Sequence, residues 1–520
     1  MISSGCEPLL KDLTEEELLR RLKMLAKNLS AITRHHNQSI KDSEEIIRHL
    51  LTTIFNIINE NNSVEVKNRI TDILSSLIME LENFTIFRAK DYLEPVLKRY
   101  FDRIFLIDYF EIKSEMYDKV YDLIFELNTI SPILLYTVLP QLEHKLHSTN
   151  ERERLAVVKL LSSIFSAEGS SFSDRFPNLL NMLLGCFDDI AVSIRITCVQ
   201  FSMHYFINHS RLRPDIIKCL LARHLDRNAT VRYEVVMAIV KTANSQLNIV
   251  CESQDLLFIL RERTLDKIFK VRREALSGLA LIYQKATFDL NDLPNEIKSS
   301  LRWIKNTVMH SYYMPTLADR ICVERILIKC LIPYQLDAKE RMKKLCHLLS
   351  TFDYNASLAF AKLQKDHMNK RKIVRSWIML HHLKEITVEA EDQLSVQQSL
   401  IIKMFPDTTN ATESLTRFSV NLRKDPDLLH YMRIILKHDV SCKECVAAML
   451  LLLKKLDVPC NENLYYQVVK MLLEIVASVM VDKKSISALV ELIDGCIQGG
   501  DTAKEMGIPE KNAGIRGLKY

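Results

Sequence analysis

The chain has 520 residues, 48% of them apolar and 26% charged, but only 10 Gly and 13 Pro, well below the roughly 7% and 5% of average proteins. Sheet proteins and nucleotide-binding folds need these residues at hairpins, crossovers and phosphate loops, so the composition favours helices joined by short polar turns. The net charge of +5, from 70 basic and 65 acidic residues, gives no chain-wide positive coat for nucleic acid.

Cysteine usage and the N-terminal sequence indicate a reducing compartment, the cytosol or the nucleus. The 12 Cys are mostly scattered singly in apolar stretches, and the first residues lack the apolar region of a signal peptide. The most apolar run, residues 446–453, is far shorter than the ~20 residues that a membrane helix needs. We therefore expect no membrane span.

In chain order, apolar periodicity and turn residues predict five segments, which are helical except for the last. The final segment contains six of the ten glycines, and a loop is expected at residues 407–412. The segments are an N-terminal helix and linker (1–42), irregular helical repeats (43–135), regular HEAT repeats (136–290), irregular helical repeats (291–494) and a Gly-containing truncated tail (495–520).

The regular repeats lie between residues 139 and 283, where four segments share one layout: an apolar helix, a polar turn and a second apolar helix. Each second helix opens with an arginine, and an aspartate stands six residues before each of the last three arginines. The arginines are Arg154, Arg195, Arg232 and Arg272, at separations of 41, 37 and 40 residues, and the aspartates are Asp189, Asp226 and Asp266.

A HEAT helix pair has about 40 residues, which matches these separations. The turn can place the aspartate near the amide groups of the second helix, while the arginine reaches a carboxylate of a neighbouring turn. The pattern therefore predicts an all-α fold, a HEAT-repeat α-solenoid of stacked antiparallel helix pairs. We interpret the Asp and Arg residues as braces between repeats and not as ligand-binding groups.

Residues 256–283 carry dense alternating charge within an apolar pattern. Such a stripe on a solenoid suits the docking of an extended peptide, and intramolecular ion pairing explains it equally well. The charged residues are Arg261, Glu262, Arg263, Asp266 and Lys267.

A basic cluster follows further along the chain, at Lys362, Lys365, Lys370, Arg371, Lys372 and Arg375. Lys370, Arg371 and Arg375 fit one side of a helix and suit a polyanion such as an inositol polyphosphate or a nucleic-acid backbone. A solvated run of surface charge is the other interpretation.

No catalytic or metal site is predicted. Cys442 and Cys445 form the only CxxC, without the second ligand pair that a structural zinc site needs, and two thiols on a buried helix face are the expected alternative. No phosphate loop, nucleophile elbow or kinase-like set of motifs occurs. We expect a protein that is not an enzyme.

Several phrases of the sequence resemble the cohesin-associated HEAT-repeat proteins of sister chromatid cohesion, the precocious-dissociation-of-sisters family. They occur in the order of the family and span most of the chain. The phrases are EEELLRRLKM (15–24), VLPQLEHKL (138–146), ERERLAVVKLL (151–161), FDDIAVSIRITCVQF (187–201), RERTLDK (261–267), VRREAL (271–276), DRICVERIL (319–327), KERMKKL (339–345) and SISALV (485–490).

The resemblance implies a hook-shaped, nuclear, non-enzymatic scaffold. It would bind the kleisin subunit of the cohesin complex and regulate the maintenance and release of sister chromatid cohesion on chromatin. No cofactor would be required, but inositol hexakisphosphate, a ligand of part of the family, would bind at Lys370, Arg371 and Arg375. The kleisin would contact Arg261, Glu262, Asp266, Lys267, Asp319, Arg320 and Glu324.

Two departures from the family pattern matter. Full-length relatives are more than twice as long, so we expect a shortened form. The chain also has no Ala-Pro dipeptide, and therefore lacks the Ala-Pro-acidic-Ala-Pro-Tyr motif that docks cohesin-release and acetylation factors, which puts their binding in doubt. Direct DNA contact stays open. The alternative function is a HEAT-repeat transport receptor or adaptor, although importin-like arrays use recurring Trp and this chain has only Trp303 and Trp377.

Overall fold

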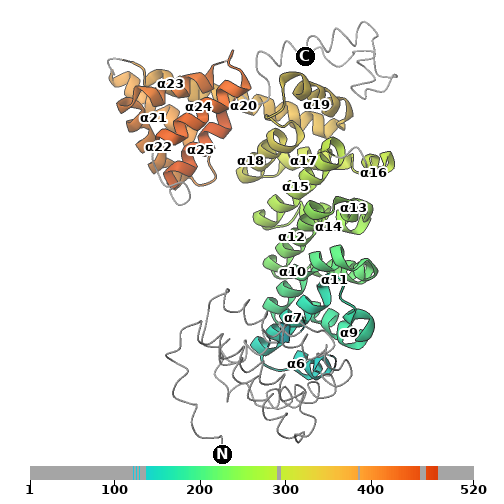
Figure 1. The fold of residues 1–520 in the computed structure, drawn as a ribbon. Coiled ribbons are helices and arrows are strands. Elements are labelled where there is room, and N and C mark those ends of the chain that lie inside the picture. The colour runs from blue at the N-terminus through green and yellow to red at the C-terminus, as the bar shows by residue number, and fades with distance from the viewer. Residues whose placement is uncertain are drawn as a thin grey trace, which may run out of the picture. The chain divides into compact units, whose positions relative to one another are not determined.

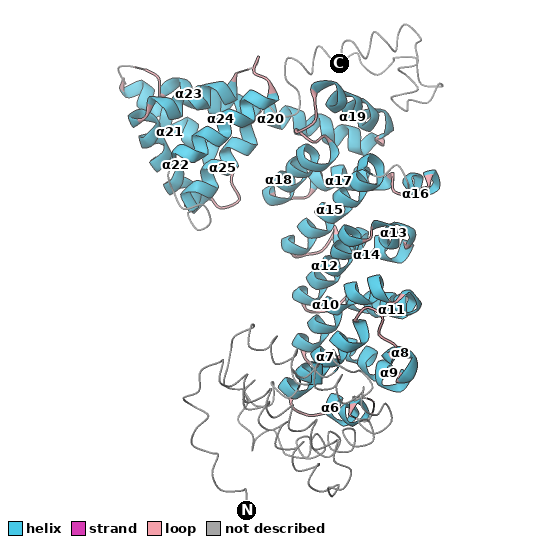
Figure 2. Ribbon diagram, viewed as in Figure 1, coloured by secondary structure: helices cyan, strands magenta, loops and turns pink. Residues whose placement is uncertain are grey.

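The computed structural model describes the chain from residue 138 to residue 477, apart from four short gaps, with a few isolated positions before residue 138 (Figure 1). Every regular element in this part of the chain is a helix, as Figure 2 shows. The chain divides into two compact units, Met1–Ala238 and Ile239–Tyr520. The segments expected at 1–42 and 495–520, and nearly all of 43–135, lie outside the described residues.

The first unit is built from helix pairs in which a shorter helix precedes a longer one. Pro177 and Pro214 stand in the first turns of two of the shorter helices, where a missing amide hydrogen costs little. The helices are α6 (Leu142–Leu146), α7 (Glu151–Ser166), α8 (Phe172–Arg175), α9 (Pro177–Gly185), α10 (Val192–Asn208), α11 (Arg213–Arg223) and α12 (Ala229–Ser245), within which the second unit begins.

The core of the first unit lies where the longer helices α7 and α10 pack against each other. Residues at helical spacing on α7, including Val157, Leu161 and Phe165, are fully buried, as are Ile194 and Phe206 on α10. Each fully buried apolar side chain of this size stabilises the fold by roughly 1.5–3 kcal/mol. The apolar residues whose spacing predicted the helices are therefore also the residues that pack the helices against each other.

The second unit contains the last regular pair and a series of less regular helices. Two of its helices continue into π-helical turns, at Lys285–Asp289 and Leu327–Leu331. The helices are α13 (Leu247–Glu252), α14 (Gln254–Arg263), α15 (Phe269–Gln284), α16 (Asn295–Ser300), α17 (Trp303–His310), α18 (Leu317–Ile326), α19 (Ala338–Thr351), α20 (Tyr354–Leu380), α21 (Val388–Ile402), α22 (Thr408–Lys424), α23 (Pro426–Leu436), α24 (Cys442–Lys455) and α25 (Leu464–Val476).

Gly278 allows α15 to approach Val240 of α12 closely. A Cβ atom at this position would lie 2.3 Å from Val240 Cγ2, well inside the contact distance of two carbon atoms. Because the valine side chain is short and β-branched, it has little freedom to move away. Glycine is therefore needed here for helix packing.

Helices α20 to α25 share one apolar core. Trp377 and Phe418 are fully buried in it, with ring centroids 6.2 Å apart.

The prediction of a loop at residues 407–412 is wrong, because α22 already begins at Thr408. Asp407 Oδ1 accepts hydrogen bonds from the amides of Thr409 and Asn410, both at 3.1 Å, so the polar run is a helix N-cap and first turn. The predicted all-α fold of helix pairs is confirmed.

Candidate functional site

Asp189 and Asp226 occupy the polar turns that lead into α10 and α12. Each carboxylate accepts a hydrogen bond from the backbone amide two residues later: Asp189 Oδ1 from Ala191 at 2.7 Å, and Asp226 Oδ1 from Asn228 at 2.8 Å. These bonds close the turn and place a negative charge beside the N-terminus of the following helix, where it is favourable. The turns therefore hold the carboxylates in place by contacts that do not involve the arginines.

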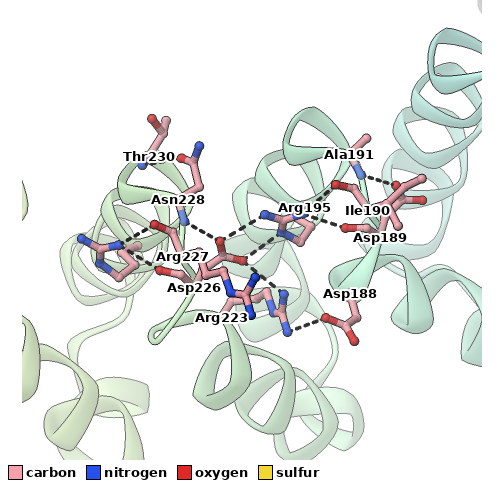
Figure 3. Close-up of polar contacts among 11 residues, drawn as sticks. Asp188, Asp189, Ile190, Ala191, Arg195, Arg223, Asp226, Arg227, Asn228 and Thr230 are labelled. Carbon is pink, nitrogen blue, oxygen red and sulfur yellow. Dashed lines mark hydrogen bonds and ion pairs between the residues drawn. The ribbon is translucent and has the colours of Figure 1, made fainter.

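An arginine of the preceding helix pair binds each of these carboxylates with two hydrogen bonds, and Figure 3 shows the pair of Arg195 with Asp226. Nε and Nη2 of Arg154 lie 3.0 and 2.9 Å from the Asp189 carboxylate. The same atoms of Arg195 lie 2.8 and 3.1 Å from that of Asp226. Arg195 Nη1 donates to the carbonyl oxygens of Asp189, at 2.7 Å, and Ile190, at 3.1 Å, in its own turn. The guanidinium therefore connects two successive turns.

Asp226 receives a further cation from α11. Arg223 Nη1 lies 3.1 Å from Asp226 Oδ2, and its Nη2 lies 2.6 Å from the exposed carboxylate of Asp188 (Figure 3). Burial by itself would raise the pKa of Asp226, but hydrogen bonds from Arg195 and the Asn228 amide, with the charges of both arginines, lower it. Asp226 is therefore ionised at neutral pH.

The second unit repeats this arrangement around Arg272. Its Nε and Nη2 lie 2.9 and 2.8 Å from the carboxylate of Asp319 in α18, and its Nη1 donates to the carbonyl oxygens of Asp266, at 2.6 Å, and Lys267, at 3.0 Å. Asp266 Oδ1 accepts the amide of Ile268 at 2.9 Å. The predicted use of these Asp and Arg residues as braces is confirmed at the contacts described here.

The residues predicted to contact a kleisin lie in two places, the end of α14 with its following turn, and α18. Asp266 and Asp319 are buried, at 5% and 1% exposed, and both are bonded within the chain. Arg272, which the prediction left out of this set, joins the two places. The exposed members are Arg261, whose guanidinium lies 5.3 Å from the Trp303 ring centroid, and Lys267; Glu262, Arg320 and Glu324 are partly exposed.

Arg371, predicted to bind a polyanion, is buried beneath the ends of two helices. Its guanidinium donates to the carbonyl oxygens of Ile435, Leu436 and Lys437 at 3.4, 3.1 and 3.2 Å, and to that of Val476. These groups end α23 and α25, where carbonyl oxygens have no partner inside their own helix. Burial lowers the pKa of Arg371, but a guanidinium stays charged. Arg371 therefore acts here as a cap for both helices.

Lys370 is bonded to a residue of the other predicted site, since its Nζ lies 2.7 Å from Oε1 of Glu324. Burial, with the charges of Arg371 and Lys370, lowers the pKa of His367 to about 4, so this histidine adds no positive charge at neutral pH. Arg375 is partly exposed. All three predicted polyanion ligands thus have interactions inside the chain.

The described residues contain no group of three or more His, Cys, Asp or Glu side chains arranged to hold a metal ion. Cys442 and Cys445 are buried on the inner face of α24, where Cys442 Sγ lies 3.7 Å from the carbonyl oxygen of Tyr334. Among the described helices, none combines the length and apolar character that a bilayer crossing requires.

Repeated helix pairs, braced at their turns by arginine and aspartate, define this chain as a HEAT-type helical repeat protein. Residues 85–506 match the model of the family described as sister chromatid cohesion protein PDS5. The chain therefore belongs to the PDS5 family of sister chromatid cohesion proteins, which confirms the resemblance found in its sequence.

Individual relatives agree with this assignment. The chain is 32% identical to PDS5 homolog B of Gallus gallus and of Homo sapiens, in each case over 92% of its length. These alignments cover 36% and 35% of the two relatives, so the chain spans about a third of their length. A chain of the solved Pds5–Scc1 complex has the same fold, with a TM-score of 0.64 and 16% identity over 95% of this chain and 85% of that one.

Proposed function

We propose that this chain is a non-enzymatic scaffold that binds the kleisin subunit of cohesin and regulates the maintenance and release of sister chromatid cohesion on chromatin, in the nucleus. The observation that carries the proposal is the family match across residues 85–506. The Pds5 relative of the same fold was solved in complex with Scc1, which supports a protein partner. In this proposal, binding requires no cofactor.

The braced turns suit this function, because a scaffold must hold its binding surface in one shape. Bidentate arginine–carboxylate pairs fix both distance and orientation, and the guanidinium also bonds to two backbone carbonyls. A partner that meets such a surface loses little binding free energy to ordering the scaffold. We propose that the kleisin contacts the exposed residues Arg261 and Lys267, together with the partly exposed Glu262, Arg320 and Glu324.

Inositol hexakisphosphate is a further proposed ligand, at Lys370, Arg371 and Arg375; Arg371 would contribute positive charge without direct contact, because its guanidinium donates to helix-end carbonyl oxygens. To reach Lys370, its phosphates must replace the Glu324 carboxylate, which lies 2.7 Å from Nζ. We leave cohesin-release and acetylation factors out of the proposal, because the chain has no Ala-Pro dipeptide with which to form their docking motif.

The test is a calorimetric titration of the full chain with purified kleisin. We expect saturable binding, weakened several-fold by the double substitution Arg261→Glu and Lys267→Glu, because exposed charge pairs at an interface contribute modestly. The matched control is Arg211→Glu with Lys218→Glu, whose side chains are 85% and 77% exposed in the first unit. Absence of kleisin binding by the folded, helical chain would overturn the proposed function.

A further inference from the structure

Helix α20 has two opposite faces that continue along all of its 27 residues. One face is buried throughout, at positions that include Ala356, Leu363, Val374 and Ile378. The positions at helical spacing on the other side are all exposed, and we call them the α20 outer stripe. They are Tyr354, Leu358, Ala361, Lys365, Met368, Lys372, Ser376 and Met379.

The α20 outer stripe is unusually apolar for an exposed helix face. Tyr354, Met379 and Met368 are 77%, 66% and 58% exposed, and Leu358 is 44% exposed. A helix of a globular protein normally places polar and charged residues on the side away from its core. A row of exposed apolar side chains about 40 Å long marks a surface that a partner can cover.

The charge of the α20 outer stripe has one sign. Lys365 and Lys372 lie within it and Lys362 lies beside it, and no exposed position from Tyr354 to Met379 is acidic. Lys362 Nζ lies 5.5 Å from the ring centroid of Tyr313. No ion pair recorded for the described residues involves any of these three lysines.

The nearby carboxylates are already bonded to other groups. Asp353 accepts from His310 at 2.9 Å, and Asp366 accepts from the hydroxyl of Tyr312 at 3.0 Å. Glu324 is bonded to Lys370, on another side of α20. These three carboxylates therefore leave the exposed lysines available to pair with acidic groups of a partner.

We infer that the α20 outer stripe docks an acidic amphipathic helix of the kleisin partner; this inference rests on the proposed function and specifies the chemistry of the partner segment. Successive stripe residues are three or four positions apart, which is the spacing of a helix seam that receives side chains of a second helix. Apolar residues of the partner cover Leu358 and Met368. Carboxylates on its flanks pair with Lys362, Lys365 and Lys372.

The mixed chemistry of the surface favours a protein helix over nucleic acid. A phosphate backbone would pair with the lysines but would leave Leu358, Met368 and Met379 uncovered, whereas an acidic amphipathic helix covers both kinds of group. The methionines also suit a helix partner, because their flexible side chains adapt to the shape of the opposing surface.

The experiment titrates the full chain into fluorescent kleisin peptides of about 25 residues that overlap along the whole kleisin, and into full-length kleisin. One variant carries Lys365→Glu with Lys372→Glu, and a second carries Leu358→Gln with Met368→Gln. The matched control carries Lys443→Glu with Lys454→Glu, two exposed lysines of α24. Circular dichroism verifies that each variant is folded.

We expect one acidic peptide to bind, about 10-fold more weakly to each α20 variant than to the control. Replacing the acidic residues of that peptide with lysine should restore its binding to the Lys365→Glu/Lys372→Glu variant.

Full-length kleisin that binds the unchanged chain and both α20 variants equally would overturn the inference and leave the proposed function standing. Kleisin that does not bind the unchanged chain would overturn both. Loss of binding to a labelled double-stranded DNA alone would also overturn the inference, because it would assign the stripe to nucleic acid.

Discussion

Arginines hold together both the regular turns and the α20–α25 region, but their hydrogen-bond partners differ. In the turns the main partner is a side-chain carboxylate, and in the α20–α25 region the partners are backbone carbonyl oxygens. Arg195 reaches the carboxylate of a neighbouring turn, and the same arrangement recurs around Arg272. Arg371 instead bonds to backbone carbonyl oxygens at the ends of α23 and α25. The turns repeat one kind of contact at three arginines, whereas in the α20–α25 region a single arginine bonds to four carbonyl oxygens at two helix ends.

This difference predicts unequal sensitivity to substitution. In the turns, the aspartate carboxylate carries a full negative charge. Removal of either the arginine or the aspartate therefore breaks their hydrogen bonds and leaves the other charge unpaired. Helix-end carbonyls contribute partial charges, but Arg371 satisfies four of them at once and stands in the middle of a shared core. We expect the single cap to be the more costly loss.

The largest effect is expected from Arg371→Met, which leaves four carbonyl oxygens without this donor, three of them in buried hydrogen bonds. We expect the α20–α25 region to lose about 4 kcal/mol of its free energy of unfolding. Urea unfolding followed by the fluorescence of buried Trp377, in a Trp303→Phe background, measures it. Lys372→Met, an exposed change on the same helix, is the control and should cost less than about 0.5 kcal/mol. Equal effects of the two substitutions would mean that the cap contributes no stability.

The next effect is expected from Asp226→Ala, which strips Arg195 and Arg223 of a shared carboxylate. We expect a loss of about 3 kcal/mol, measured by hydrogen exchange of the amides of α10 and α11. Asp215→Ala, which removes an exposed carboxylate of α11, is the control. Adding Arg195→Met to Asp226→Ala should recover part of the loss, since it removes the unpaired cation. A double variant less stable than Asp226→Ala would contradict the brace interpretation.

A smaller effect is expected from Gly278→Ala, because its Cβ would lie 2.3 Å from Val240 Cγ2. Helices α12 and α15 must then separate, at a cost of about 1–3 kcal/mol. Thermal unfolding measures the change. Val240→Ala in the same chain makes room for the new methyl group and should restore part of the stability; without such rescue, close packing at this point would not be the cause.

The smallest effect is expected at the N-terminus of α24, where Ser441 and Glu444 form a capping box. The Glu444 amide donates to Ser441 Oγ at 3.3 Å, and the Ser441 amide donates to Glu444 Oε2 at 2.9 Å. Ser441→Ala should cost about 1 kcal/mol, and Ser441→Thr should cost less, because threonine keeps the hydroxyl. Trp377 fluorescence again reports the unfolding. A Thr variant as unstable as the Ala variant would argue against the cap.

The comparison also explains what the sequence could reveal. The turn contacts recur about every 40 residues, so the helix pairs and the pairing of Arg154 and Arg195 with carboxylates of the following turns were predictable from spacing alone. Arg371 could not be predicted, because its carbonyl partners lie 64 to 105 residues away and backbone carbonyls leave no mark in a sequence. Its neighbours Lys370 and Lys372 made it look like one member of a surface cluster.

Two further points depend on single residues. The run after Asp407 looked like a loop because its residues are polar, although an Asp followed by Thr and Asn is also a common helix start. Asp266 and Asp319 were expected to contact the partner, but no feature of the sequence indicated that Arg272 connects them. The kleisin contacts at the exposed residues stay a prediction.

The arginine–aspartate contact has a direction along the chain. At Arg154, Arg195 and Arg272, the arginine donates through Nε and Nη2 to a carboxylate of the next helix pair, and through Nη1 to carbonyls of the turn inside its own pair. A helix pair of this kind is therefore an interchangeable module, with a donor at one end and an acceptor at the other. Gain or loss of one whole pair during evolution would rejoin donor to acceptor, whereas gain or loss of half a pair would leave a buried charge unmatched.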